Sequence, residues 1–234
     1  MNETNSRKKV PISPQLSSAD QVAEEVVRRL YSGRYVAGQK LIEADLVEEL
    51  HVSRGTIREA LRRLSAEGVV SLTLHRGAYI RAFSKNDVQN ILDVIEVLLG
   101  LAARTAAKKT HSARAKKQLE AYLRAILEPQ QNYYDVVRVQ NAFYRFLISS
   151  SENEELERVL PSLNFHFLRP AYLVRSPRVY PERLKEFELI ATAVLSGDAK
   201  RAEQTARNHV IAIARSLKEL PDEAFSGSTG ITKT

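Results

Sequence analysis

Residues 41–80 read LIEADLVEELHVSRGTIREALRRLSAEGVVSLTLHRGAYI, and this stretch decides the fold of the first third of the chain. Its opening segment carries Leu46 and Leu50 four residues apart among acidic residues, which predicts a short helix with one buried stripe. The next three residues break that pattern. They end at Ser53, whose hydroxyl can cap a second helix by accepting from an unpaired backbone amide. The stretch therefore predicts two helices joined by a tight turn.

The second predicted helix has an apolar face and an arginine face. Apolar residues recur at three- and four-residue spacing, at Ile57, Leu61 and Leu64. Arginines fall four apart on another face, at Arg54, Arg58 and Arg62. A planar guanidinium can hold guanine O6 and N7, or two phosphate oxygens, at the same time. A helical pair of this kind enters the DNA major groove, whereas the alternative is an ordinary hairpin with a solvated arginine face.

Two short β-prone runs follow the second helix, at residues 69–73 and 78–81. Gly68 comes before them, where a glycine ends a helix because it tolerates a positive φ. The tip between the runs contains His75, Arg76 and Gly77, so it can reach the adjacent minor groove or the DNA backbone. Helix, turn, arginine-bearing helix and hairpin occur in this order, which favours DNA binding over the solvated face.

The segment resembles the winged helix-turn-helix of GntR-family bacterial regulators. The residues that match the family pattern are Leu41, Glu43, Leu46, Val52, Ser53, Arg54, Arg58, Glu59, Ala60, Leu61, Leu64, Glu67, Gly68 and Gly77. The resemblance implies operator contacts by the arginines and the wing tip. Gly55 stands where threonine is common and Ala44 where some members carry a further arginine, so the operator sequence stays open.

We expect the DNA-contacting residues to lie on the second helix, its cap, the wing and one preceding turn. They are Arg34, Ser53, Arg54, Gly55, Thr56, Arg58, Arg62, His75, Arg76 and Gly77. Of these, Arg34 is expected to contact only the phosphate backbone.

Composition is that of an ordinary globular protein with a basic surface. The 234 residues are 44% hydrophobic and 27% charged, with a formal net charge of +7 that favours a polyanionic partner. The absence of cysteine excludes disulfides and thiolate metal sites. No apolar run approaches the roughly 18 residues of a membrane span, and the N-terminus lacks a signal-peptide core. We therefore expect a cytoplasmic protein with no membrane partner.

The chain divides into four predicted parts. Residues 1–15 are polar with two prolines and are expected to form a disordered arm; residues 16–82 form the winged helix-turn-helix domain. Residues 83–220 are expected to form a helical effector-binding and dimerisation domain, and residues 221–234 a flexible tail.

Capping signals give the starts of two further helices. Ser18 with Gln21 predicts a capping box for a helix through Tyr31, and Ser84 with Asp87 predicts one for a long helix to about Lys109.

The second half of the chain reads as helices throughout. The long helix that begins after Ser84 is apolar on more than one face, which indicates contact with its own bundle and with a second subunit. Further helices are predicted at about 112–127, 134–149, 152–174 (interrupted by Pro161 and Pro170), 181–195 and 198–220. The predicted fold class is mainly α: an N-terminal winged helix-turn-helix plus a C-terminal antiparallel all-helical bundle.

The bundle half is similar to the FCD domain found in one branch of the GntR family. Many members bind a divalent metal through one aspartate and three histidines, and the metal holds a small carboxylate effector. Here Gln140, Tyr144 and Phe187 stand at three of those positions, and only His209 is retained. One imidazole with an amide and a phenol is a poor ligand set, so no metal cofactor is expected.

Two interpretations of this region stay open. In the first, the pocket persists and binds a less charged or larger small-molecule effector; its residues are Ile95, Gln140, Tyr144, Phe187 and His209. In the second, these side chains fill a closed core, and the bundle serves only as a dimerisation module. Ile95 stands where many members have an arginine, so in either case the site has lost charge.

The sequence therefore predicts a transcriptional regulator, expected to be a repressor, that binds a palindromic DNA operator as a homodimer. An enzyme is disfavoured because no Glu-x-x-His pair, glycine-rich phosphate loop or Ser/His/Asp order appears. A non-specific architectural DNA binder would not need so large a second domain.

Overall fold

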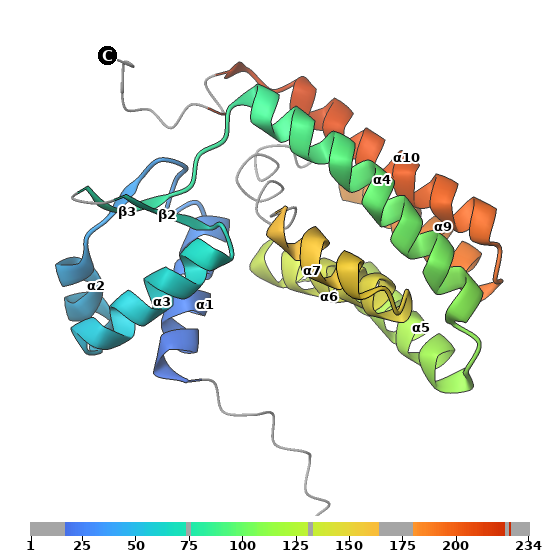
Figure 1. Ribbon diagram of the computed structural model, residues 1–234, viewed down its shortest axis with the longest axis horizontal. Helices are drawn as coiled ribbons and strands as arrows, with labels where there is room; N and C mark the ends of the chain where they lie inside the picture. Colours follow the sequence, from blue (N-terminus) through green and yellow to red (C-terminus); the bar gives the residue numbers. More distant parts are fainter. Residues whose placement is uncertain (1–16, 74–75, 131–132, 164–179, 223–224, 226–234) are drawn as a thin grey trace, which may run out of the picture.

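The computed structural model describes residues 17–73, 76–130, 133–163, 180–222 and 225. The predicted disordered arm (1–15) and most of the predicted flexible tail (221–234) lie outside these residues. Within them the chain forms a small N-terminal α/β unit beside a helical bundle (Figure 1).

The N-terminal unit is a winged helix-turn-helix, as the sequence predicts. Its elements are α1 (Ser18–Tyr31), β1 (Lys40–Leu41), α2 (Glu43–Leu50), α3 (Arg54–Ala66), β2 (Val70–Thr73) and β3 (Gly77–Ile80). The strands form an antiparallel sheet in the order β1-β3-β2, so the wing strand β3 lies in the middle. Helix α1 packs on α3, and the predicted apolar face of α3 is buried in the core.

The bundle contains six helices among the described residues. They are α4 (Lys85–Lys109), α5 (Ala113–Leu127), α6 (Tyr133–Ser150), α7 (Glu154–Ser162), α9 (Tyr180–Leu195) and α10 (Ala199–Lys218). Helices α4 and α10 run side by side (Figure 1). Gly100 permits this approach, because a Cβ there would lie 2.7 Å from Arg207 Cγ. No helix in the described part of the chain is long and apolar enough to cross a membrane.

The N-terminal ends of α1 and α4 show whether the two predicted capping boxes form. The box at Ser84 and Asp87 is confirmed, since each side chain accepts from the other residue's backbone N–H. The box predicted at Ser18 and Gln21 is wrong by one residue: Ser17 Oγ accepts from Asp20 N at 3.1 Å, and Asp20 Oδ2 accepts from Ser17 N at 3.2 Å. Asp20 is a stronger acceptor than Gln21, and it stands at the third helical position only if the helix begins at Ser18.

One other predicted helix differs at its end. The helix predicted for residues 152–174 ends at Ser162 as α7, and the segment with the second proline lies outside the described residues.

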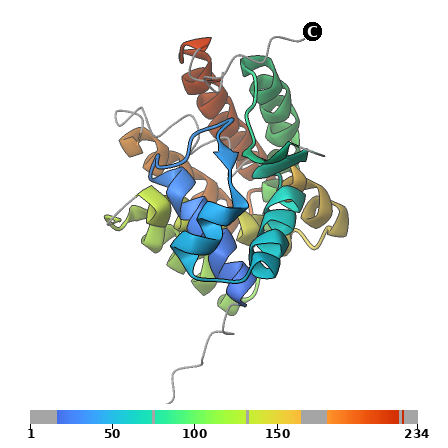
Figure 2. The same ribbon diagram turned by 90° about the vertical axis from the view of Figure 1, so that its left-hand side faces the viewer.

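The two domains touch between α1 and α6. The rings of Tyr31 and Tyr134 lie with centroids 5.8 Å apart, and Tyr31 is buried. Helix α1 packs against α6, and Figure 2 shows the N-terminal unit in front of the bundle. Burial raises the pKa of Tyr134, with the Glu24 carboxylate on α1 adding to the shift. The contact joins the helix that supports α3 to the helix that carries Gln140 and Tyr144.

Candidate DNA-binding surface and effector site

The turn between α2 and α3 fixes the start of the arginine-bearing helix. His51 ends α2 with a φ of 53°, in the left-handed region that lets the chain reverse tightly. Ser53 Oγ then accepts from Thr56 N at 3.1 Å and lies 2.8 Å from Thr56 Oγ1. At Gly55 a Cβ would meet only Ser53 Oγ, at 3.6 Å, so packing does not require a glycine there. The predicted cap is confirmed, and it leaves the first turn of α3 open to a ligand.

The three predicted arginines of α3 are all exposed on the side away from the core, but they are held differently. Arg58 Nε donates to Glu43 Oε2 at 2.9 Å, which joins α3 to the first residue of α2. Arg62 Nε donates to the backbone oxygen of Arg58 at 3.3 Å. Within the described residues no carboxylate lies within ion-pair distance of Arg54 or Arg62. These two cations are therefore available to phosphates without breaking an ion pair.

A buried arginine fixes α1 against α2, and the sequence analysis did not single it out. Arg29 donates to Glu25, to Tyr35 Oη and to Glu49. Burial by itself lowers the pKa of Arg29, but these three bonds outweigh it and raise the pKa above its ordinary value. The spacing of Glu25 and Arg29 was a local signal, whereas the bond to Glu49 depends on the tertiary structure.

The remaining predicted DNA-contact residues belong to the segment after α1 and to the wing. Arg34 is exposed, and its Nη2 lies 3.8 Å from Glu49. Arg76 and Gly77 stand at the exposed end of the wing, where Gly77 has a φ of +91°. His75 lies outside the described residues. The sequence analysis missed Lys40, an exposed cation on β1 whose Cε would lie 3.8 Å from a Cβ at Gly77.

Three of the predicted effector residues, Tyr144, Phe187 and His209, pack on one another inside the bundle, and Ile95 belongs to the same buried core. Ile95, Phe187 and His209 are fully buried, and Gln140 and Tyr144 are 1% and 5% exposed. Tyr144 Oη lies 2.6 Å from His209 Nε2, and the ring of Phe187 lies 4.9 Å from that of His209.

Glu186 completes this cluster, and the sequence analysis overlooked it. Its Oε2 lies 2.6 Å from His209 Nδ1. A carboxylate only accepts, so Nδ1 donates to Glu186, and a neutral ring then accepts at Nε2 from the Tyr144 hydroxyl. Both ring nitrogens of His209 are therefore engaged.

The donors at this position do not fit the divalent metal that the FCD resemblance implies. A metal would have to displace Tyr144 or Glu186 from His209, and it would find an amide at Gln140 and a benzene ring at Phe187. In the described part of the chain no three His, Asp or Glu residues gather as metal ligands.

One polar atom in the cluster stands out. Gln140 Oε1 is buried and has no hydrogen-bond partner among the described residues. A buried amide oxygen without a donor is unfavourable by about 1–3 kcal/mol, and it lies one helical turn from Tyr144 on α6.

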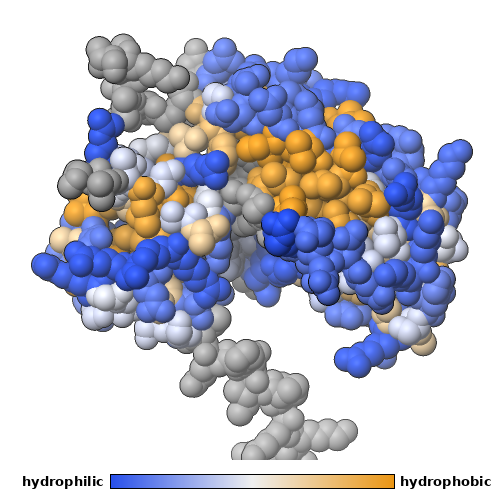
Figure 3. All heavy atoms as spheres, in the orientation of Figure 1, coloured by the Kyte–Doolittle hydropathy of each residue, from blue (hydrophilic) through white to orange (hydrophobic). Residues whose placement is uncertain are grey.

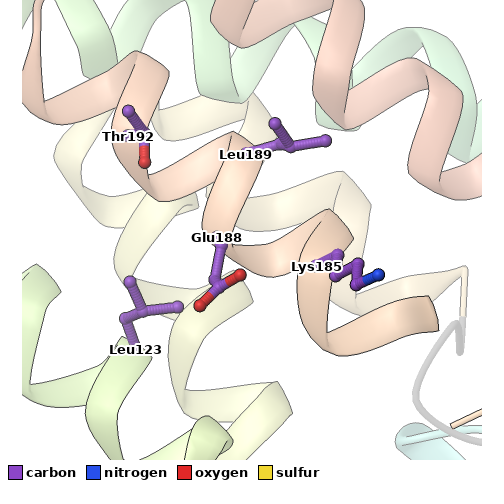
Figure 4. Close-up of a pocket in the computed structure, with 5 residues that line it drawn as sticks. All are labelled: Leu123, Lys185, Glu188, Leu189 and Thr192. Carbon is purple, nitrogen blue, oxygen red and sulfur yellow. The ribbon is translucent and has the colours of Figure 1, made fainter. Parts of the chain in front are cut away.

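The bundle also has a surface groove between α5 and α9 (Figure 4). It measures about 570 Å³ and is lined by Leu123, Lys185, Glu188, Leu189 and Thr192. None of the predicted effector residues lines it. Its two charged side chains are exposed, so the groove offers no buried polar group to orient a small molecule.

Helix α4 exposes an apolar stripe. Val94 and Val97 are 47% and 53% exposed, and Ile91, Leu98 and Leu101 are half-buried along the same side. In Figure 3 apolar side chains gather on the bundle half of the visible face, where α4 runs. The second face predicted from the sequence is therefore present and uncovered in the single chain.

Two family models match the chain. Residues 18–80 match "Bacterial regulatory proteins, gntR family", and residues 90–212 match the FCD domain. The chain is 24% identical over 196 residues to a probable D-xylose utilization operon transcriptional repressor of Paenarthrobacter nicotinovorans, covering 83% of this chain and 86% of that one. It is 24% identical over 229 residues to the galactonate operon transcriptional repressor of Escherichia coli, covering 88% and 99%.

Solved structures share the fold. McbR/YncC of E. coli superposes with a TM-score of 0.71 at 20% identity, covering 88% of this chain and all of that one. A GntR regulator from Rhodococcus sp. RHA1 superposes with a TM-score of 0.70 at 19% identity, covering 87% and 98%. At such identities the likeness establishes the shared architecture, not a shared ligand.

Proposed function

Since the chain belongs to the GntR family of bacterial transcriptional regulators and carries an FCD domain, we propose that it binds a palindromic DNA operator as a homodimer and represses transcription. The single observation that supports this most is the exposed arginine face of α3, which begins at a capped, open helix start. The named relatives are transcriptional repressors, and we propose regulation rather than catalysis for this chain.

The second copy is proposed to cover the apolar stripe of α4. Water-exposed Val94 and Val97 are unfavourable in a monomer, and a two-fold axis would bury the same stripe of both copies. Two winged helices held in this way, about one DNA turn (~34 Å) apart, would read a palindromic site.

We propose that the bundle responds to a small organic effector without a metal. The orphaned Gln140 Oε1 supports an uncharged ligand group that donates a hydrogen bond, and the contact of α6 with α1 would carry a change in the bundle to the DNA-binding domain. The second candidate is a closed bundle that only dimerises, and the tight packing around His209 favours it.

The DNA-binding proposal is tested with Arg58→Ala. An operator is first selected from random DNA, and binding is then measured by fluorescence anisotropy over a range of salt concentrations. Arg58→Ala should lose the preference for the selected operator while remaining a dimer. Arg138→Ala removes the same charge from an exposed position on α6 and is the matched control. Normal operator preference in Arg58→Ala would disprove the assignment of α3 as the reading helix.

The effector proposal is tested by thermal-shift screening of chelator-stripped protein against divalent metals, small organic acids, sugars and acyl-CoA esters. A ligand at about 100 Kd adds roughly 2.7 kcal/mol of stability. A shift with an organic ligand alone supports the metal-free pocket. A large shift with zinc, nickel or manganese contradicts the metal-free pocket. The absence of a shift with every compound favours the closed bundle.

A further inference from the structure

The ion pair between Glu43 and Arg58 places an acidic group inside a surface proposed to bind DNA. Arg58 is the central arginine of α3, its side chain is 61% exposed, and its Nε–H points to Glu43 Oε2 at 2.9 Å. Glu43 is the first residue of α2, whose packing on α3 fixes the distance between the two backbones. A carboxylate at a DNA-binding surface repels phosphate, so its presence there requires a reason.

The geometry of the Arg58 guanidinium explains why a carboxylate at this place can help to bind DNA. Arginine has one N–H on Nε and two on each terminal nitrogen. When Glu43 holds Nε, the edge formed by the two terminal nitrogens stays free. That edge carries two parallel donors, the pattern that matches O6 and N7 of guanine. An arginine side chain also has many rotamers, and holding it before DNA arrives lowers the cost of ordering it on binding.

The negative charge of Glu43 also affects which DNA group Arg58 contacts. A free arginine on an exposed helix can turn to the nearest phosphate, which adds affinity but no sequence information. A carboxylate beside Arg58 opposes that movement, because it attracts the guanidinium and repels phosphate. Arg54 has no such carboxylate among the described residues, so it can serve as a phosphate contact.

We propose that Glu43 is a positioning residue that makes Arg58 read bases instead of phosphates. Glu43 thereby raises the ratio of operator affinity to non-specific affinity, although it lowers the attraction of the surface for DNA in general. The inference rests on the proposed operator binding and adds to it the residue that sets specificity.

The test compares Glu43→Ala with the wild-type protein on the selected operator and on a scrambled duplex of the same length. Operator affinity should fall roughly 5- to 20-fold, within the range of one bidentate base contact. Affinity for the scrambled duplex should rise roughly two- to threefold as a repulsive charge is removed. Opposite changes in affinity for the two duplexes would indicate positioning, because loss of folding would lower the affinity for both.

Three matched variants separate positioning from charge. Asp45→Ala removes an exposed acid from the same turn of α2, one that has no ion pair among the described residues, so both affinities should rise together. Glu43→Gln should keep most of the operator preference, because an amide oxygen still accepts the Arg58 N–H. In an Arg58→Ala background, Glu43→Ala should change the affinity ratio no further.

The outcomes are distinguishable. If the wild-type protein does not prefer its selected operator, the proposed function fails, and the inference fails with it. If the wild-type protein prefers the operator and Glu43→Ala keeps the same ratio, only the inference is overturned. Equal behaviour of Glu43→Ala and Asp45→Ala would likewise overturn it, since charge alone would then explain both.

Discussion

Replacing Tyr144 by phenylalanine asks whether the cluster around His209 is a closed core or a water-filled pocket. The substitution keeps the ring against Phe187 and removes only the hydroxyl that lies 2.6 Å from His209 Nε2. His209 is fully buried, so in a closed core no water can replace the lost hydroxyl. Removing one partner of a buried hydrogen bond is unfavourable by about 1–3 kcal/mol. For a chain of this length each kcal/mol lowers the melting temperature by about 2–4 °C, so we expect a loss of roughly 2–12 °C.

The assay is thermal unfolding followed by circular dichroism at one fixed pH in chelator. Tyr122→Phe is the matched control, because Tyr122 Oη accepts from Gln118 at 3.2 Å in a partly exposed place that water can reach. It should stay within about 0.5 kcal/mol of the wild-type protein. If Tyr144→Phe melts together with Tyr122→Phe, water reaches His209, and the closed-core reasoning is refuted in favour of an open pocket.

Three further predictions concern the cap, the α4 stripe and the domain contact. Ser53→Ala should destabilise the N-terminal domain by about 1 kcal/mol, measured by urea unfolding; no change would mean that the cap bond is not formed in solution. Val97→Asp should convert dimer to monomer in sedimentation equilibrium without lowering the melting temperature of the monomer, and a persistent dimer would place the interface elsewhere. Burial raises the pKa of Tyr134 above its ordinary 10.0, so its contribution to stability is complete below the unfolded-state pKa and falls as pH rises through the folded one. Melts between pH 8 and 11 should therefore lose less in Tyr134→Phe than in the wild-type protein, and identical losses would contradict a buried ring.

Local patterns predicted much of the fold because they depend on neighbours in sequence. The arginines four apart on α3, the Ser53 cap and the Ser84–Asp87 capping box all involve residues within one or two helical turns. Such interactions follow from helix geometry, whatever else the chain packs against. One capping box was predicted at Ser18 but forms at Ser17. Two serines in a row fit the same pattern, and the carboxylate acceptor of Asp20 determines which of them caps the helix.

The candidate sites were predictable in part. The sequence predicts which residues of α3 face outward, and it brings His209 and Tyr144 into one cluster through the FCD resemblance. It does not contain a signal for Glu186 as the second partner of His209, because that 2.6 Å contact depends on the rotation of α9 against α10.

By itself the sequence determined that this protein has a winged helix-turn-helix followed by a helical bundle, since periodicity and capping are local and survive without tertiary contacts. Only the tertiary structure decided which charged side chains pair with one another. The pairing of Arg58 with Glu43 joins residues 15 positions apart, and the burial of Arg29 against Glu49 joins residues 20 apart. Both require α2 to pack at a particular place on its neighbours. A chain can bring such distant groups within hydrogen-bond reach only after its core has fixed the helices, and no spacing rule along the sequence contains that information.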